Sequence, residues 1–150
     1  MTKIYHKLVL LVVLSFLFGG CTYYKNINEL KANMKSNDFD TTVVKAKFKD
    51  VKRHILANTS RCFSTMYNVH GSCKVHTNTH TKFEISCTRQ MQDGIFSSNK
   101  TPVLLPYIKI EKVDNTHTKL STYSGYYSST INTIVVEWAT DVHQMCPSIL

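Results

Sequence analysis

The chain has 150 residues, 18 of them basic and 10 acidic, so its formal net charge at pH 7 is +8. This length leaves room for one domain with a modest hydrophobic core. The sequence contains no G-x-S-x-G, H-E-x-x-H, C-x-x-C or glycine-rich phosphate loop, which excludes the familiar signatures of hydrolases, metalloproteases and nucleotide-binding enzymes. We therefore expect a non-catalytic protein without a cofactor.

The first 21 residues have the layout of a secretory signal. Lys3 and Lys7 precede an apolar run, Leu8–Phe18, which is 11 residues long and is interrupted only by Ser15. A membrane-spanning helix needs roughly 20 apolar residues, so this run is too short to favour a retained anchor. The segment predicts export. A cleaved signal is favoured over an uncleaved membrane helix.

The end of this segment, Gly19-Gly20-Cys21, resembles the lipobox of bacterial lipoproteins. The resemblance implies cleavage before Cys21 and a lipoprotein that carries diacylglycerol and palmitate on that residue. Thr22 follows Cys21, whereas an aspartate there is associated with inner-membrane retention in enterobacterial lipoproteins. The resemblance therefore implies an envelope protein at the outer membrane, facing the periplasm. An ordinary secretory signal is the alternative.

This interpretation divides the chain into three parts: a signal peptide (1–20), a polar, lipid-anchored tether (21–40) and a single domain (41–150). Without Lys3 and Lys7 the net charge falls from +8 to +6. A basic envelope protein is attracted to anionic lipid or glycan, and another envelope protein is the other expected class of partner. Export excludes nucleic acid. Inhibition of lysozyme fits poorly, because many lysozymes are themselves cationic.

The cysteine count agrees with this division. The chain has five cysteines, and four remain if Cys21 carries the lipid. An even number in an exported chain favours two disulfides, and four cysteines allow three pairings. We prefer Cys73 with Cys87, across a predicted hairpin, and Cys62 with Cys146, between the ends of the first and last helices.

Helical periodicity marks both ends of the domain. Residues 42–59 are predicted as a helix from an apolar stripe with steps of four, three and four: Val44, Phe48, Val51 and Ile55. Basic residues lie away from this stripe: Lys45, Lys49, Lys52 and Arg53. They form either a solvated face or a contact with anionic lipid or glycan. A wider stripe predicts a helix over 128–145, although Ile134, Val135 and Val136 are β-branched and favour a strand.

Between the two helices the sequence predicts about four antiparallel strands, over 73–76, 81–91, 103–113 and 117–127, with 63–69 as a weaker candidate. A connected sheet with both helices on one face is a two-layer α+β sandwich. This order resembles small helix–sheet–helix lipoproteins of unknown function, and the resemblance carries no functional residues across.

Tyrosines gather near the last two predicted strands. Tyr107 and Tyr123 are expected to share the sheet face away from the helices, close to Tyr126, Tyr127 and Lys109. Such a face is a candidate surface for sugar or peptide. Ordinary cross-strand packing is the alternative.

Histidines gather between positions 70 and 80. His70, Cys73, His76 and His80 invite a zinc or copper interpretation. However, an oxidised Cys73 cannot be a thiolate ligand, and His76 and His80 would lie about 13 Å apart in an extended strand. We therefore predict no metal site and expect exposed loop histidines. A metal-binding or hydrolytic periplasmic protein using residues 70–80 is the alternative to a non-catalytic, lipid-anchored protein that acts by binding or assembly.

Overall fold

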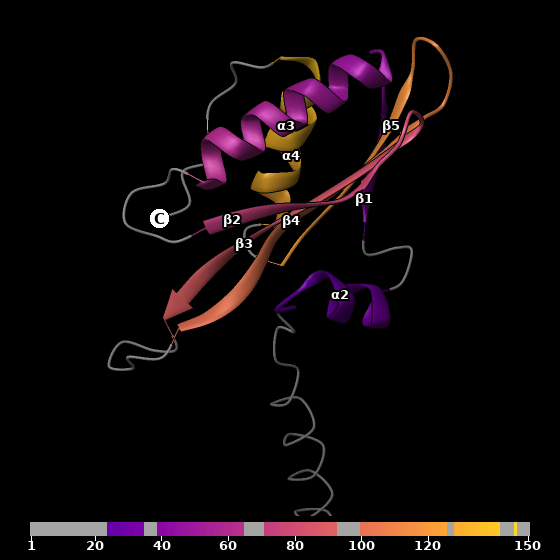
Figure 1. The fold of residues 1–150 in the computed structure, drawn as a ribbon. Helices are drawn as coiled ribbons and strands as arrows, with labels where there is room; N and C mark the ends of the chain where they lie inside the picture. The colour runs from indigo at the N-terminus through magenta and orange to yellow at the C-terminus, as the bar shows by residue number, and fades with distance from the viewer. Residues whose placement is uncertain are drawn as a thin grey trace, which may run out of the picture.

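The computed structural model describes residues 24–34, 39–64, 71–92, 100–125, 128–141 and 146. Cys21, His70, Tyr126 and Tyr127 lie outside these described residues. The helices and strands, in chain order, are α2 (Ile27–Asn33), β1 (Asp40–Val44), α3 (Phe48–Ser64), β2 (Gly71–Asn78), β3 (Lys82–Gln92), β4 (Lys100–Lys112), β5 (Thr118–Ser124) and α4 (Ser128–Thr140) (Figure 1).

The strands form one antiparallel sheet of five in the order β1-β5-β4-β3-β2. Four of them follow one another along the chain as a meander, and β1 adds to the outer edge of β5, with Asp40 opposite Thr122 and Val44 opposite Thr118. The α+β class expected from the sequence is confirmed. The sheet has five strands rather than about four, and the additional strand is β1.

The prediction that a helix begins near Thr42 is wrong, because residues 40–44 form β1. Four consecutive β-branched residues, from Thr41 to Val44, favour an extended chain over a helix. Val44 is buried as the apolar stripe predicted, but it reaches the core from a strand. The helix itself begins at Phe48 and continues to Ser64, so the weaker strand candidate at 63–69 begins inside a helix.

Helices α3 and α4 cover one face of the sheet, and the short helix α2 lies on the opposite face (Figure 1). The main core lies between the sheet and the two longer helices. Trp138 of α4 is fully buried there, and its ring meets that of Phe63 edge-on at a centroid distance of 5.8 Å. Each such side chain contributes roughly 1.5–3 kcal/mol through burial of its apolar surface. α4 is helical despite its β-branched residues, because its apolar stripe faces this core.

Two disulfides link distant parts of this layer. Cys62 of α3 is joined to Cys146, 84 residues later, and Cys73 of β2 is joined to Cys87, its direct partner in β3. These are the two pairings preferred from the sequence. Both bridges adjoin the main core, since Cys62 and Cys87 are fully buried.

Residues 24–34, expected in a tether, form a packed part of the domain. The side chain of Asn26 accepts hydrogen bonds from the backbone N–H groups of Asn28 and Glu29, which caps α2. Leu30 is fully buried in a second apolar cluster with Leu104 and Tyr107. The polar composition of this segment indicates a tether in which residues 28–35 could form a short helix, with Leu30 and Met34 on one side, and the buried Leu30 and the Asn26 cap hold that helix on the sheet.

Candidate functional site

The tyrosine surface predicted from the sequence is covered by the chain itself. Tyr107 is only 2% exposed, and the ring of Phe39 lies 5.9 Å from it. Tyr123 is half-buried and meets the ring of Tyr24 at 5.6 Å. The segment that carries α2 therefore occupies the place where a sugar or peptide was expected.

Lys109, the basic member of that predicted surface, forms an ion pair. Its Nζ atom lies 2.8 Å from Oε2 of Glu111, and both side chains are about one-third exposed. Tyr126 and Tyr127 fall outside the described residues. The cross-strand packing alternative describes Tyr107 and Tyr123 better than an open ligand surface does.

Beside Tyr107 lies a buried carboxylate. The Glu84 side chain is 4% exposed, and its oxygens lie 3.0 Å from Nζ of Lys31 and 2.8 Å from Nζ of Lys82. The Thr77 hydroxyl donates to Oε2 of Glu84 at 3.1 Å. Burial on its own would raise the pKa of Glu84, but the hydrogen bonds and charges of the two lysines outweigh it and lower the pKa to about 2.

This arrangement is suited to holding α2 rather than to proton transfer. A general base is most effective when its pKa lies near the working pH, and Glu84 is ionised far below it. Burial, followed by the negative charge of Glu84, raises the pKa of Tyr107, so this hydroxyl stays protonated. Lys31 belongs to α2, and its contact with Glu84 of β3 fastens the helix to the sheet.

The described histidines and the cysteine between positions 70 and 80 do not come together in the structure. His76 lies on β2, where its Nε2 atom is 2.7 Å from the Ser86 hydroxyl, and burial together with Lys31 and Lys74 lowers its pKa. Cys73 is in a disulfide, and His80 is exposed between β2 and β3. Within the described ranges, no three His, Cys, Asp or Glu residues come together as a potential metal site.

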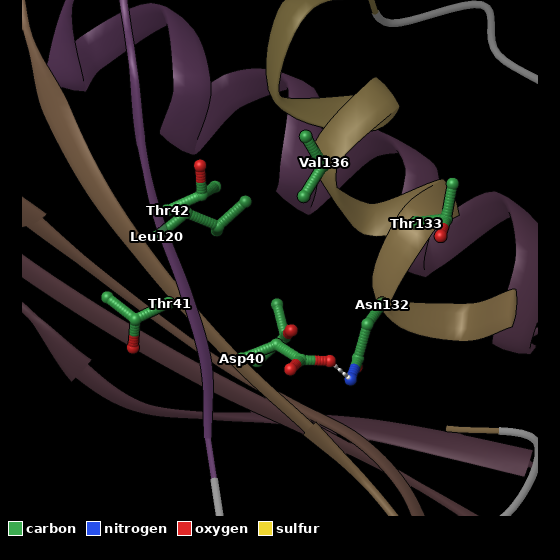
Figure 2. Close-up of a pocket in the computed structure, with 8 residues that line it drawn as sticks. Asp40, Thr41, Thr42, Leu120, Asn132, Thr133 and Val136 are labelled. Carbon is green, nitrogen blue, oxygen red and sulfur yellow. Dashed lines mark hydrogen bonds between the residues drawn. The ribbon is translucent and has the colours of Figure 1, made fainter. Parts of the chain in front are cut away.

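A pocket of about 330 Å³ opens between β1 and α4 (Figure 2). Pairing of β1 with β5 sets Asp40 opposite Thr122 and Thr42 opposite Leu120, and α4 closes the other side. The lining residues are Asp40, Thr41, Thr42, Leu120, Thr122, Asn132, Thr133 and Val136. The lining residues thus comprise four threonines, an asparagine, an aspartate and two aliphatic residues.

One hydrogen bond spans the pocket, and two polar atoms beside it have no partner. The Asn132 amide donates through Nδ2 to the Asp40 carboxylate, and the two side chains point toward one another in Figure 2. Thr122 Oγ1 and Asn132 Oδ1 are buried without a hydrogen-bond partner, and these residues are 1% and 8% exposed. A buried polar group left unpaired costs about 1–3 kcal/mol, which a water or ligand hydrogen bond would recover.

Asp40 is the charged residue among those lining the pocket, and no lysine, arginine or histidine accompanies it. The pocket is therefore locally acidic in a protein of basic overall charge, and it disfavours anions. Sequence reasoning misses it, because a helix is predicted from residue 42 onward and Asn132 lies beside an apolar stripe. The run of β-branched residues after Asp40 is the signal that would have identified a strand there.

None of the helices that the structure describes combines the length and the apolar character needed to cross a membrane. Comparison with known protein families finds no family model that matches the chain. Comparison with curated proteins finds no match either.

Proposed function

We propose that this chain is a lipid-anchored, non-catalytic protein of the bacterial cell envelope, attached to the outer membrane on its periplasmic side, and that it acts by binding. The observation that carries the anchor is the pairing of the cysteines. Cys62 pairs with Cys146 and Cys73 with Cys87, which leaves Cys21 as the fifth. A lipobox-like signal ends at this leftover residue, so the two observations support the same assignment.

Mass spectrometry of the mature N-terminus in a bacterial host tests the anchor. We expect the chain to begin at Cys21 and to carry a diacylglyceryl group. Cys21→Ser should move the protein from the membrane fraction to the soluble periplasmic fraction. A mature chain that keeps Met1, or an unmodified Cys21, would contradict the proposal.

The pocket between β1 and α4 supports the binding role. Its lining offers the Asp40 carboxylate, the Asn132 carbonyl and threonine hydroxyls, and it contains no basic group. We infer that it takes a small ligand that donates hydrogen bonds and carries no negative charge. The aliphatic surface of Leu120 and Val136 would contact the carbon skeleton of that ligand.

Saturation-transfer NMR with a panel of small amines, neutral sugars and carboxylates tests this assignment. We expect transfer to amines or sugars and none to carboxylates. Thr133 is an exposed lining residue on α4, so Thr133→Tyr should obstruct the pocket and abolish the signal. Thr140→Tyr, exposed on the same helix but outside the pocket, is the matched control. Transfer that survives Thr133→Tyr, or that favours carboxylates, would refute the pocket assignment.

A further inference from the structure

The short distance along the chain between Cys21 and α2 has a geometric consequence. The backbone N–H of Leu104, in the sheet, donates to the carbonyl of Tyr24 at 2.9 Å, so the chain is already fixed to β4 at residue 24. Only three residue steps separate Tyr24 from Cys21. Fully extended, three residues span at most about 11 Å.

We propose that the sheet face carrying α2 rests against the anionic membrane surface that holds the Cys21 lipid, while α3 and α4 face away from it. This inference rests on the lipid anchor proposed above and adds the orientation of the domain. Tyr24, where the link to Cys21 begins, lies on the α2 side of the sheet, since its ring contacts Tyr123 on that face.

The alternative orientation, with the basic side of α3 on the membrane, does not fit the length of the link. α3 and α2 lie on opposite faces of the sheet (Figure 1). The link starts at Tyr24, which is bonded to the sheet, whereas the axis of α3 lies about 10 Å from the sheet and its solvent-facing side about 5 Å farther, which is more than three residues can span. Both the α2 face and the outer side of α3 are basic, so charge alone does not distinguish them. The length of the link favours the α2 face as the surface against the membrane.

The charges on the α2 face fit anionic headgroups. Exposed lysines lie just before α2, on α2 and on the strands beneath it: Lys25, Lys31, Lys74 and Lys119. Lys119 shares its face with Tyr123, because alternate residues of a strand point the same way. Of the acidic side chains on α2 and on this face, Glu84 is buried between Lys31 and Lys82, Glu111 pairs with Lys109, and Glu29 accepts a hydrogen bond from the Lys25 backbone N–H at 2.8 Å. Near the membrane these lysines lie within the Debye length of about 8 Å over which surface charge acts.

Lysine labelling on vesicles tests the orientation. The mature protein is reconstituted in vesicles of phosphatidylcholine, with or without phosphatidylglycerol, and treated with a sulfonated amine-reactive ester. A monovalent anionic reagent is depleted about threefold at a surface potential of about −30 mV. We expect labelling of Lys25 and Lys119 to fall at least about threefold relative to detergent on anionic vesicles. Lys49, exposed on α3, should keep its detergent rate.

A flexible glycine–serine insertion after Thr22 is the matched variant. About 20 such residues reach roughly 25 Å, so the insertion removes the restraint without changing the domain. We expect the insertion to abolish the protection of Lys119 from labelling on phosphatidylcholine vesicles. On anionic vesicles, part of that protection should remain. Equal protection of Lys49 and Lys119, or protection on phosphatidylcholine that is unaffected by the insertion, would overturn the proposed orientation.

Failure of the lipid anchor is distinguished by mass spectrometry of Cys21 in the same preparation. If Cys21 is a free thiol, the anchor proposal fails, and the thiol is then coupled to maleimide lipid in the vesicles. The other four cysteines are in disulfides, so Cys21 alone reacts. The labelling experiment then tests the three-residue link by itself, with the same expected and contradicting results.

Discussion

Nζ of Lys31 lies 3.0 Å from Oε2 of Glu84, and this ion pair connects the first described helix to the start of β3. Glu84 would be costly to bury alone, but the two lysines satisfy it, and Thr77 adds a hydrogen bond. The Lys31 ammonium also lies 5.6 Å from the centre of the Tyr107 ring. The same residues therefore fix α2 and close the tyrosine face.

Glu84→Gln tests this ion pair through pH dependence. The pKa of Glu84 is lowered from 4.5 to about 2 in the folded protein, so its stabilisation is present above pH 4.5 and is lost as the pH falls toward 2. With a discount for the half-exposed lysines, we expect the variant to lose about 2 kcal/mol at pH 7. Urea unfolding at pH 7 and pH 2.5 measures this.

The difference between wild type and Glu84→Gln should shrink markedly at pH 2.5. Glu111→Gln, on the same face but one-third exposed, is the control and should cost less than about 1 kcal/mol at either pH. A difference for Glu84→Gln that does not depend on pH would mean that the carboxylate charge is not the stabilising feature.

Leu30→Ala should release α2. Leu30 is fully buried, and truncation of a buried leucine costs about 2–5 kcal/mol. Because α2 lies outside the main core, we expect the cost to appear as local opening. The Leu104 amide, bonded to Tyr24, should then exchange with solvent at least about tenfold faster. Leu56→Ala, 42% exposed on α3, should leave this rate unchanged, and an unaffected rate in Leu30→Ala would contradict the docking.

Removal of either disulfide should lower the free energy of unfolding, by a larger amount for one bridge than for the other. The Cys62–Cys146 bridge spans 84 residues and the Cys73–Cys87 bridge spans 14. Loop-closure entropy predicts losses of about 4.5 and 3 kcal/mol for paired alanine substitutions. Urea unfolding of the two double variants measures both, and a larger loss from the short bridge would count against this explanation.

A pair of threonine-to-valine substitutions tests the unpaired atom in the pocket. Thr122 and Thr118 are both buried on β5, but Thr118 Oγ1 donates to the Ala46 carbonyl at 2.8 Å, whereas Thr122 Oγ1 has no partner. Thr118→Val should destabilise by about 1 kcal/mol, and Thr122→Val should be neutral or stabilising by up to about 1 kcal/mol. Thermal unfolding of both variants measures the sign. Destabilisation by Thr122→Val would show that this hydroxyl is hydrogen-bonded in solution.

The parts of the fold that the sequence predicted are those with strong local patterns. The apolar stripe of α4 is wide enough to outweigh β-branched Val135, and the alternation around Ile85 identifies β3 together with the Cys73–Cys87 pair. Pro106 lies inside β4, and a proline within a strand is typical of a sheet edge, yet β4 is central. The pairing of β3 with β4 shifts register opposite this proline, and a bulge tolerates a residue without an N–H group.

The parts that sequence reasoning missed depend on contacts between distant residues. β1 is short and is stabilised by pairing with β5, about 80 residues away, so its β-branched run is the local feature that separates it from a helix start. The docking of α2 on the sheet depends on the contact of Leu30 with Leu104 and Tyr107. The pocket joins Asp40 to Asn132, 92 residues apart, and no spacing rule connects them.

The position of β1 in the sheet also sets the order in which the strands can pair during synthesis. The four strands β2 to β5 pair with their neighbours in sequence, so they can assemble as successive hairpins. β1 is made before all of them, yet it must wait for β5 to emerge, and Cys62 must wait longer still for Cys146. A chain interrupted before residue 118 has no strand to receive the β-branched run that starts at Thr41. Such fragments would expose an unpaired strand and the unpaired thiol of Cys62, and unpaired strand edges are prone to aggregation.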